Sequence, residues 1–247
     1  MAGTAAFLGV AESVLGRRWA ARDACEDASR EIARAAQVPE IVARLLAGRG
    51  VTADGAAQYL RPSLKADLPD PSILANMDRA AARIADAVQA RESIAIFGDY
   101  DVDGAASSAL LKRYLRSVGI DARVYIPDRM REGYGPNPDA MRTLASDGAR
   151  LIVTVDCGTQ AHLALAAARD AGVDVIVCDH HQQAAQLPPA FAVVNPNALA
   201  DESGLGQLCA AGVAFLMAVA VNRELRRRGW FGSDRPEPDL MPLVGLA

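Results

Sequence analysis

The sequence contains few of the residues that build disulfide-rich, aromatic-rich or strongly basic proteins. Its four cysteines lie far apart and form no CxxC pair, so neither a zinc knuckle nor a dense disulfide framework is expected. Aromatic residues make up only 5% of the chain, so its core must be packed mainly with aliphatic side chains. A net charge of -4 argues against a protein whose whole surface binds nucleic acid. Any such contact must be a local groove or lie in parts of a protein not present here.

The sequence also lacks long apolar runs and a recognisable targeting segment. No uninterrupted apolar stretch is long enough to span a bilayer, and the first residues show neither a basic leader nor a cleavage site. We therefore expect no membrane contact and a reduced, cytoplasmic protein.

The first 90 residues show a mostly helical pattern. Apolar periodicity begins near Ser29 and runs to Leu46, and a second short helix is predicted over residues 53–60. A loop rich in Pro and Asp follows, and a long helix over residues 77–90 leads to the first strand. This pattern predicts a helical N-terminal region over residues 1–90.

Strands and helices alternate from residue 91 onward. Five apolar segments are predicted as strands, at residues 93–97, 122–126, 151–155, 173–177 and 191–194. Helices are predicted between and after them, at residues 105–116, 138–146, 161–171 and 208–227. Continuous apolar strands separated by amphipathic helices indicate an α/β fold: a mainly parallel five-stranded sheet with helices on both faces. We assign this domain to residues 91–228, and residues 229–247 to the start of a truncated continuation.

Three of the predicted strands end in polar residues. The first leads into the segment GDYDVDG at residues 98–104, the third into Asp156, and the fourth into Asp179-His180-His181. Because the carboxyl ends of parallel strands share one edge of a sheet, these side chains are expected to converge there. Carboxylate oxygens and imidazole nitrogens suit Mn²⁺ or Mg²⁺.

Two cations fit this set of side chains. Asp101 and Asp103 alternate in an extended loop, so both can face one side, where Asp156 and His180 would join them. Two cations held there would activate a water and stabilise the attacking and leaving oxygens of a phosphoester. Gly104 would let the backbone approach a phosphate closely.

Each strand end taken alone has an ordinary structural explanation. A DxD segment is common in turns, and an aspartate such as Asp156 often caps a helix. Two of the chain's three histidines, however, stand side by side at one strand end. The three strand ends together therefore favour a metal site.

At these residues the sequence resembles the DHH phosphoesterase family, and within it the RecJ-type exonucleases. The matching segments are IAIFGDYDVDGAASSALL, LIVTVDCGT, VIVCDHHQ, IPDRMREGYGPN, VVNPN and LCAAGVAFLMA. The resemblance implies metal-dependent hydrolysis of phosphodiester bonds in single-stranded DNA, as a 5′-to-3′ exonuclease in DNA repair and recombination. It also implies a single-strand-binding protein as a further partner.

The resemblance also implies roles for particular residues. Asp101, Asp103, Asp156 and His180 would be metal ligands, and His181 would contact the scissile phosphate. Asp99 and Asp179 would orient the ligands. The substrate groove would be lined by Arg129, Arg131 and Tyr134, with Gly104 and His181 beside it. Phe97 stands where some family members carry a ligand histidine, so the first metal position is less completely specified.

Other functions stay open at this point. One is a phosphodiesterase of the same family that acts on short oligonucleotides or cyclic dinucleotides, and another is a non-catalytic nucleic-acid-binding relative. A receiver domain with an acidic Mg²⁺ pocket is a third, but it would not need two adjacent histidines and is usually shorter.

The resemblance further implies parts that would follow residue 247. These are another metal-binding aspartate, a second lobe and a nucleic-acid-binding OB-type domain. We therefore expect the present chain by itself to bind metal weakly and to cut DNA poorly. Nuclease activity comparable with that of a longer version would contradict this expectation.

Overall fold

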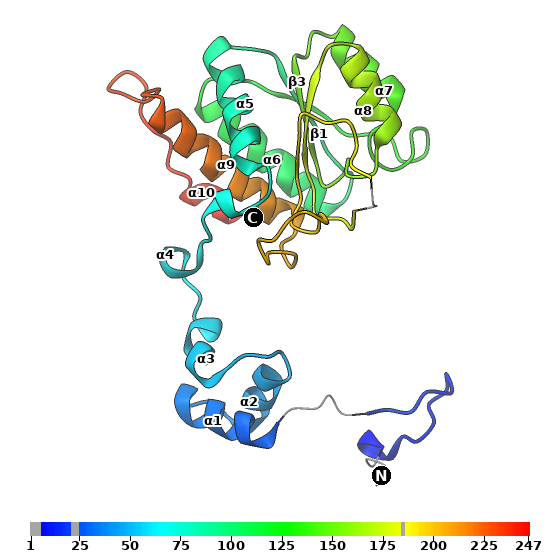
Figure 1. Ribbon diagram of the computed structural model, residues 1–247, viewed down its shortest axis with the longest axis vertical. Coiled ribbons are helices and arrows are strands. Elements are labelled where there is room, and N and C mark those ends of the chain that lie inside the picture. The colour runs from blue at the N-terminus through cyan, green and yellow to red at the C-terminus, as the bar shows by residue number, and fades with distance from the viewer. Residues whose placement is uncertain (1–5, 21–24, 184–185) are drawn as a thin grey trace. The chain divides into compact units, whose positions relative to one another are not determined.

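The computed structural model describes residues 6–20, 25–183 and 186–247 (Figure 1). It divides into two compact units, Met1–Leu68 and Pro69–Ala247. The first unit contains the short helices η1 (Phe7–Gly9), α1 (Glu26–Ala36), α2 (Glu40–Ala47), α3 (Ala53–Leu60) and α4 (Leu64–Asp67). Of these, α1, α2 and α3 pack around a small core.

The first unit differs from its predicted helical pattern at one point. The periodicity that runs from Ser29 to Leu46 spans two helices, because the chain turns between α1 and α2. Gln37 adopts a left-handed conformation with φ 52°, and Pro39 at the start of α2 has no N–H to continue the first helix. The predicted helix over residues 53–60 is confirmed as α3, and the Thr52 side chain caps it by accepting from the Gly55 N–H.

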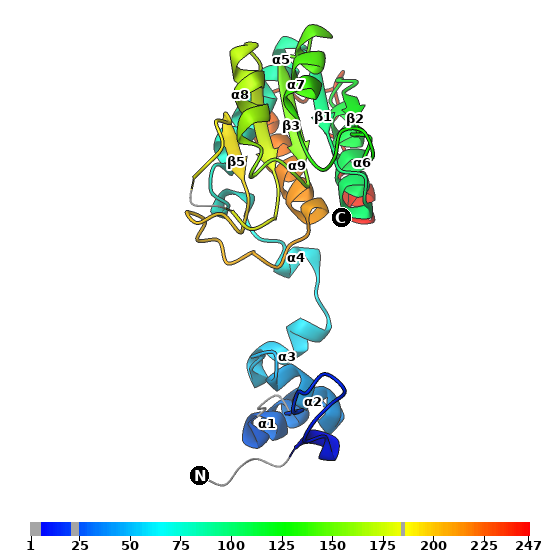
Figure 2. The same cartoon turned by 90° about the vertical axis from the view of Figure 1, so that its right-hand side faces the viewer.

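The second unit is built on the predicted parallel sheet. Its strands are β1 (Ile94–Phe97), β2 (Arg123–Tyr125), β3 (Leu151–Val155), β4 (Asp174–Cys178) and β5 (Ala192–Val194). They are all parallel, in the order β2-β1-β3-β4-β5, so β2 and β5 form the two edges (Figure 2). The chain leaves β1 toward one edge and returns to build β3 on the other side. Ligands of such sheets bind where the direction reverses, here at the carboxyl ends of β1 and β3.

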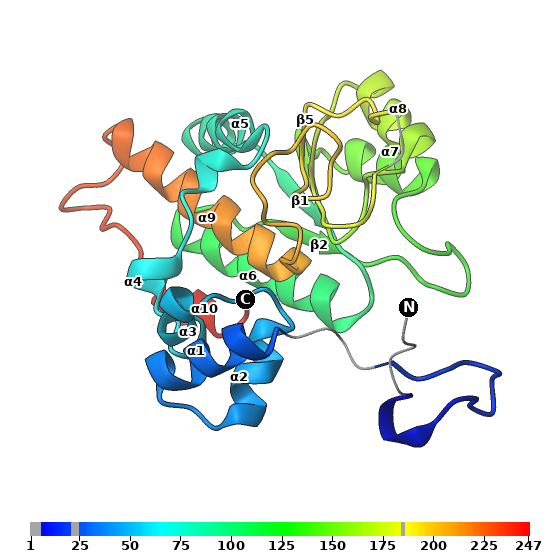
Figure 3. The same cartoon turned by 60° about the horizontal axis from the view of Figure 1, so that its bottom comes forward.

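Helices cover both faces of the sheet, as predicted (Figure 1). One face packs against α5 (Met77–Ala90), α6 (Val102–Ser117) and α9 (Ala210–Arg227), which lie side by side in Figure 3. The other face packs against α7 (Pro138–Ser146) and α8 (His162–Asp170). Short elements complete the unit: η2 (Pro71–Ile73) and α10 (Met241–Val244). None of the helices in the described ranges is both long and apolar enough to cross a membrane.

Helix α5 belongs physically to the α/β unit, because its buried face shares a core with the sheet and α9. Arg83 strengthens this attachment through ion pairs with Glu92 at 2.8 Å and with Asp174, at the start of β4, at 2.7 Å. Trp230 and Leu243 pack on the same core. The boundary between the two compact units thus lies after Leu68, whereas the sequence pattern predicts a domain boundary at residue 90. The division into residues 1–90, 91–228 and 229–247 stays a prediction about domains.

The attachment of α5 predicts a clear effect on stability. Ile84 is 2% exposed in the shared core, so Ile84→Ala is expected to lower the free energy of unfolding by about 2–4 kcal/mol. Ile73 in the same unit is 47% exposed, and Ile73→Ala is expected to cost less than about 1 kcal/mol. Urea unfolding followed by Trp230 fluorescence, in a Trp19→Phe background, compares the two. Equal small losses would mean that α5 does not support the sheet.

Candidate metal centre

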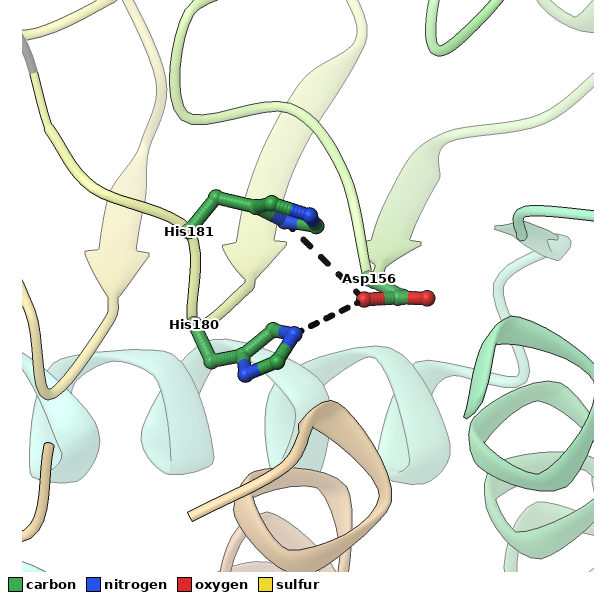
Figure 4. Close-up of side chains that lie close together, drawn as sticks. All are labelled: Asp156, His180 and His181. Carbon is green, nitrogen blue, oxygen red and sulfur yellow. Dashed lines mark ion pairs between the residues drawn. The ribbon is translucent and has the colours of Figure 1, made fainter. Parts of the chain in front are cut away.

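The predicted carboxylates and imidazoles come together at the carboxyl ends of the central strands. Figure 4 shows the side chains of His180 and His181, which follow β4, directed at Asp156, which follows β3. The Nε2 atom of His180 lies 3.3 Å from Oδ1 of Asp156 and 3.6 Å from Oδ2 of Asp103. The Nδ1 atom of His181 lies 3.9 Å from the same Asp156 oxygen. The three strand ends therefore share one site.

Asp156 stands at the centre of this site in an unusual environment. Its backbone adopts φ 60°, which is uncommon for a residue other than glycine and typical of strained functional positions. The side chain is buried, and among the described residues its Oδ1 atom has no hydrogen-bond partner. Burial, together with the negative charges of Asp103 and Asp101, raises the pKa of Asp156 to about 8. A cation at this oxygen would compensate the buried charge.

Asp156 belongs to two groups of potential metal ligands. One consists of Asp156, His180 and His181, and the other of Asp99, Asp101 and Asp156. Within each group the ligand atoms lie within 4.8 Å of one another. Because Asp156 is common to both, it could contribute a carboxylate oxygen to a cation in either group.

Asp99 was expected to orient ligands, but its surroundings resemble those of a ligand. It is 4% exposed, and its Oδ1 atom accepts no hydrogen bond from the described residues. Burial, and secondarily the charge of Asp101, raise the pKa of Asp99. The Phe97 ring is fully buried and stacks on Tyr125 with centroids 5.3 Å apart. Phe97 offers no donor atom, so Asp99 is the additional donor within the second group.

Asp101 and Asp103 also serve as local structural anchors. Asp101 caps α6, because its Oδ1 accepts from the N–H groups of Asp103 and Gly104 at 2.9 and 3.0 Å. The Gly104 hydrogen bond is the main cause of a lowered Asp101 pKa. Asp103 caps a different helix, since its two oxygens accept from the Ala210 and Ala211 N–H groups at the start of α9, each at 2.8 Å. Both aspartates are thus held firmly beside Asp156.

His180 is held in the tautomer that a metal ligand needs. Its Nδ1 atom lies 3.1 Å from the Leu208 carbonyl oxygen, which can only accept, so Nδ1 carries a proton. Nε2 then faces the carboxylates of Asp103 and Asp156 with its lone pair, unless a second proton is bound. The acceptor for the second nitrogen of His180 is thus the Leu208 carbonyl; neither Asp99 nor Asp179 serves this function.

Asp179 orients His181 instead. Its Oδ1 atom lies 2.8 Å from Nδ1 of His181 and accepts from the backbone N–H groups of both histidines. Burial works against the charge of Asp179, but hydrogen bonds from Thr159 and His181 outweigh it and lower the pKa. For His181, burial favours the neutral ring, but the Asp179 carboxylate outweighs it and raises the pKa. The pair therefore favours a positively charged His181.

Two asparagines that the sequence reasoning did not assign hold the histidine segment in place. The Asn195 side chain donates to the His181 carbonyl and to Thr159 Oγ1, both at 2.9 Å. The Asn197 side chain donates to the His180 carbonyl at 2.6 Å. The VVNPN segment after β5 was noted only as part of the resemblance. The sequence feature that could have indicated their role is the position of two asparagines directly after a predicted strand.

The predicted groove residues differ in how closely they approach the centre. Tyr134 is adjacent, since its hydroxyl donates to the Asp156 carbonyl at 3.1 Å and lies 3.4 Å from Nε2 of His181. Arg129 lies over the Tyr100 ring at 5.1 Å, whereas Arg131 is exposed. A cavity of about 330 Å³ adjoins His181, and its walls include Tyr134, Gly135, Thr159, Gln160 and Asp179.

Gly104 is buried under the loop that carries Asp99. A Cβ atom added at Gly104 would lie 2.7 Å from backbone atoms of Asp99. The absence of a side chain therefore lets α6 begin directly against this loop. Its approach to a phosphate stays a prediction.

A match to the sequence profile of one protein family covers the residues around this centre. The profile of the DHH family, N-terminal domain, matches residues 93–242, more than half of the chain. The chain belongs to the DHH family. The matched range includes all five strands and every ligand candidate described above, so the resemblance in the sequence motifs is confirmed for the DHH family.

Individual DHH proteins resemble the chain over most of its length. The single-stranded-DNA-specific exonuclease RecJ of Bacillus subtilis is 36% identical over 84% of this chain, and the Escherichia coli protein of the same name is 38% identical over 85%. The matches cover 26% and 36% of those two relatives. The chain thus spans about a quarter to a third of their length.

Solved structures of RecJ proteins are also similar to this chain. A RecJ exonuclease bound to manganese has 36% identity and a TM-score of 0.57, over 62% of this chain and 38% of that chain. RecJ of Thermus thermophilus in complex with Mn²⁺ has 29% identity and a TM-score of 0.67, over 89% of this chain and 29% of that chain.

The crowding at Asp156 predicts a pH dependence of stability in the presence of a chelator. The pKa of Asp156 in the folded protein is about 8, above its value in the unfolded chain. The protonated carboxyl group therefore makes its full contribution to the free energy of unfolding below about pH 4, and this contribution is lost as the pH rises through 8. The free energy of unfolding is therefore expected to fall between about pH 5.5 and about pH 8.5, with Asp156 contributing on the order of 1–3 kcal/mol.

Urea unfolding at both pH values tests this expectation. Asp156→Asn removes the titrating group and should reduce the decline, whereas the exposed Asp121, changed to Asn, should leave the decline as in the wild type. An Asp156→Asn variant with the full wild-type decline would contradict the assigned electrostatics.

Proposed function

We propose that the chain is the metal-binding part of a 5′-to-3′ exonuclease that hydrolyses phosphodiester bonds in single-stranded DNA. The observation that carries the proposal is the Asp156 carboxylate. One of its oxygens is buried and accepts no hydrogen bond from the described residues, and the residue is shared by two groups of potential ligands. Similarity to proteins named single-stranded-DNA-specific exonuclease RecJ supports the substrate and the reaction.

Two cations, Mn²⁺ or Mg²⁺, are proposed as cofactors. Asp156 and His180, with Asp103 beside them, would hold one, and Asp99, Asp101 and Asp156 would hold the other. Oxygen donors with a single imidazole suit these ions, and similar solved structures contain manganese. When bound, such ions activate a water and neutralise the charge that develops on phosphate oxygens.

His181 has a separate role in the proposed reaction. Asp179 holds its Nδ1 at 2.8 Å and favours the charged ring, so Nε2 carries an N–H on the side of Tyr134 and the adjoining cavity. A charged imidazole fixed in this way can donate to an oxygen of the scissile phosphate and stabilise negative charge there. The Tyr134 hydroxyl lies 3.4 Å from Nε2 of the ring.

The remaining features of the proposal rest on resemblance and on sequence pattern. Arg129, Arg131, Tyr134 and Gly104 are proposed to line the DNA groove, of which Tyr134 lies nearest the centre. A single-strand-binding protein as partner, a role in DNA repair and recombination, and a cytoplasmic location stay predictions.

Metal stoichiometry tests the shared carboxylate. Calorimetric titration with Mn²⁺ is expected to give two ions for the wild type, one for His180→Ala, and none for Asp156→Asn, because both groups lose Asp156. Asp121→Asn, at an exposed carboxylate away from the centre, should bind as the wild type does. Wild-type binding by Asp156→Asn would move the metal site elsewhere.

Hydrolysis assays test the reaction and the substrate. In Mn²⁺, slow shortening of a long single strand from its 5′ end is expected, and Asp156→Asn should reduce the rate by about 100-fold or more. Cyclic dinucleotides and dinucleotides should be poorer substrates. Cleavage of these short substrates alone would favour the alternative phosphodiesterase, and equal rates for wild type and Asp156→Asn would reject the proposed centre.

A further inference from the structure

A second cavity lies at the opposite end of the strands from the candidate metal centre. It has a volume of about 420 Å³, and it forms where α5 and α6 end and where the chain turns after α9. Because α5 and α6 lead into the starts of β1 and β2, this cavity is at the amino ends of the strands. Its wall carries three arginines and one carboxylate: Arg91, Arg116, Arg235 and Asp234.

The arginines of this cavity differ from those of α9. There the guanidinium groups are neutralised, for example Arg226 by Glu237, and Arg228 after the last turn by Asp86 and Glu224. On α5, Arg83 is paired with Glu92 and Asp174. Arg91 and Arg116, in contrast, make no ion pair or side-chain hydrogen bond with any described residue. The cavity therefore has uncompensated positive charge.

Arg235 adds a third guanidinium in a fixed position. It lies over the Trp230 ring at 3.6 Å and donates to the Trp230 carbonyl at 3.1 Å, but forms no ion pair with Asp234 within the described residues. Stacking on an aromatic ring orients the planar group and leaves its other N–H donors available. One carboxylate thus faces three positive charges.

Binding to the negative ends of α5 and α6 is the simplest alternative role for Arg91 and Arg116. In that role their guanidinium groups would donate to carbonyls of the last helical turns, as Arg49 does to the Leu45 carbonyl. Neither Arg91 nor Arg116 makes such a hydrogen bond among the described residues. Their convergence on a cavity with Arg235 is better explained by an anionic ligand.

We propose that this cavity is a second, non-catalytic site for a phosphate group. Arginine pairs readily with phosphate through its forked N–H donors, and three of them around a concave surface of this size can surround one phosphate. The phosphate can come from a free phosphate-bearing molecule or from the backbone of a nucleic acid. The site requires no divalent cation and is independent of the proposed hydrolysis.

The test uses the chain in a Trp19→Phe background, where Trp230 is the only tryptophan and reports on the cavity. Inorganic phosphate and an oligothymidylate without terminal phosphates are titrated separately, by calorimetry and by Trp230 fluorescence. A chelator keeps the candidate metal centre free of cations, and the ionic strength is held constant. Saturable binding of either probe is expected. Phosphate alone would indicate a free phosphate group, and the oligonucleotide a backbone phosphate.

Two variants distinguish specific binding in the cavity from non-specific attraction of an anion to a positively charged surface. The double variant Arg91→Gln/Arg116→Gln should weaken binding by about tenfold or more, since each lost guanidinium removes charge-assisted hydrogen bonds. Arg113→Gln changes another exposed arginine of α6 that does not line the cavity, and should alter the affinity by less than about twofold. Circular dichroism verifies that both variants fold.

Two results would overturn the proposal. One is the absence of saturable binding of both probes by calorimetry. The other is an equal loss of affinity in Arg113→Gln and in the double variant.

Discussion

The site depends on one electrostatic constraint: several carboxylates meet around a buried oxygen of Asp156 that accepts no hydrogen bond from the described residues. Asp99, Asp101 and Asp103 surround it, and burial raises the pKa of both Asp99 and Asp156. A folded protein keeps such an arrangement only if the surrounding structure holds it there or a ligand compensates it. The hydrogen bonds of Asp101, Asp103 and Asp179 to backbone N–H groups supply the first requirement. Divalent cations would supply the second.

Much of the fold followed from local sequence patterns. Buried parallel strands are continuous apolar runs, so all five were located to within two residues at each end, and the polar residues that follow them identified one edge of the sheet. The pattern failed between α1 and α2, where apolar spacing continues although α1 ends at Ala36 with the left-handed Gln37, before Pro39 starts the next helix. Periodicity records which side chains are buried, and two helices in succession can bury theirs with the same spacing.

The contacts that hold the site together could not be predicted from the sequence, because they join segments that are distant along the chain. Nothing local to Asp103 indicates that it caps α9, 107 residues further along the chain. The Leu208 carbonyl as partner of His180, and Asn195 and Asn197 as supports of the histidine segment, likewise depend on the folded structure. Asp99 shows the same limit. The sequence indicates a carboxylate beside the site, but its burial and its lack of a hydrogen bond at Oδ1 become visible only in the folded structure.

The start of α9 has a consequence of its own. Within four residues, the Leu208 carbonyl fixes the ring of His180, and the N–H groups of Ala210 and Ala211 fix the carboxylate of Asp103. Two elements of the centre are therefore attached to a single short stretch of backbone. A displacement of this stretch by a bound partner or by a neighbouring part of a protein would move imidazole and carboxylate in concert. The end of one helix would thereby act as a mechanical control on the spacing of the charged groups.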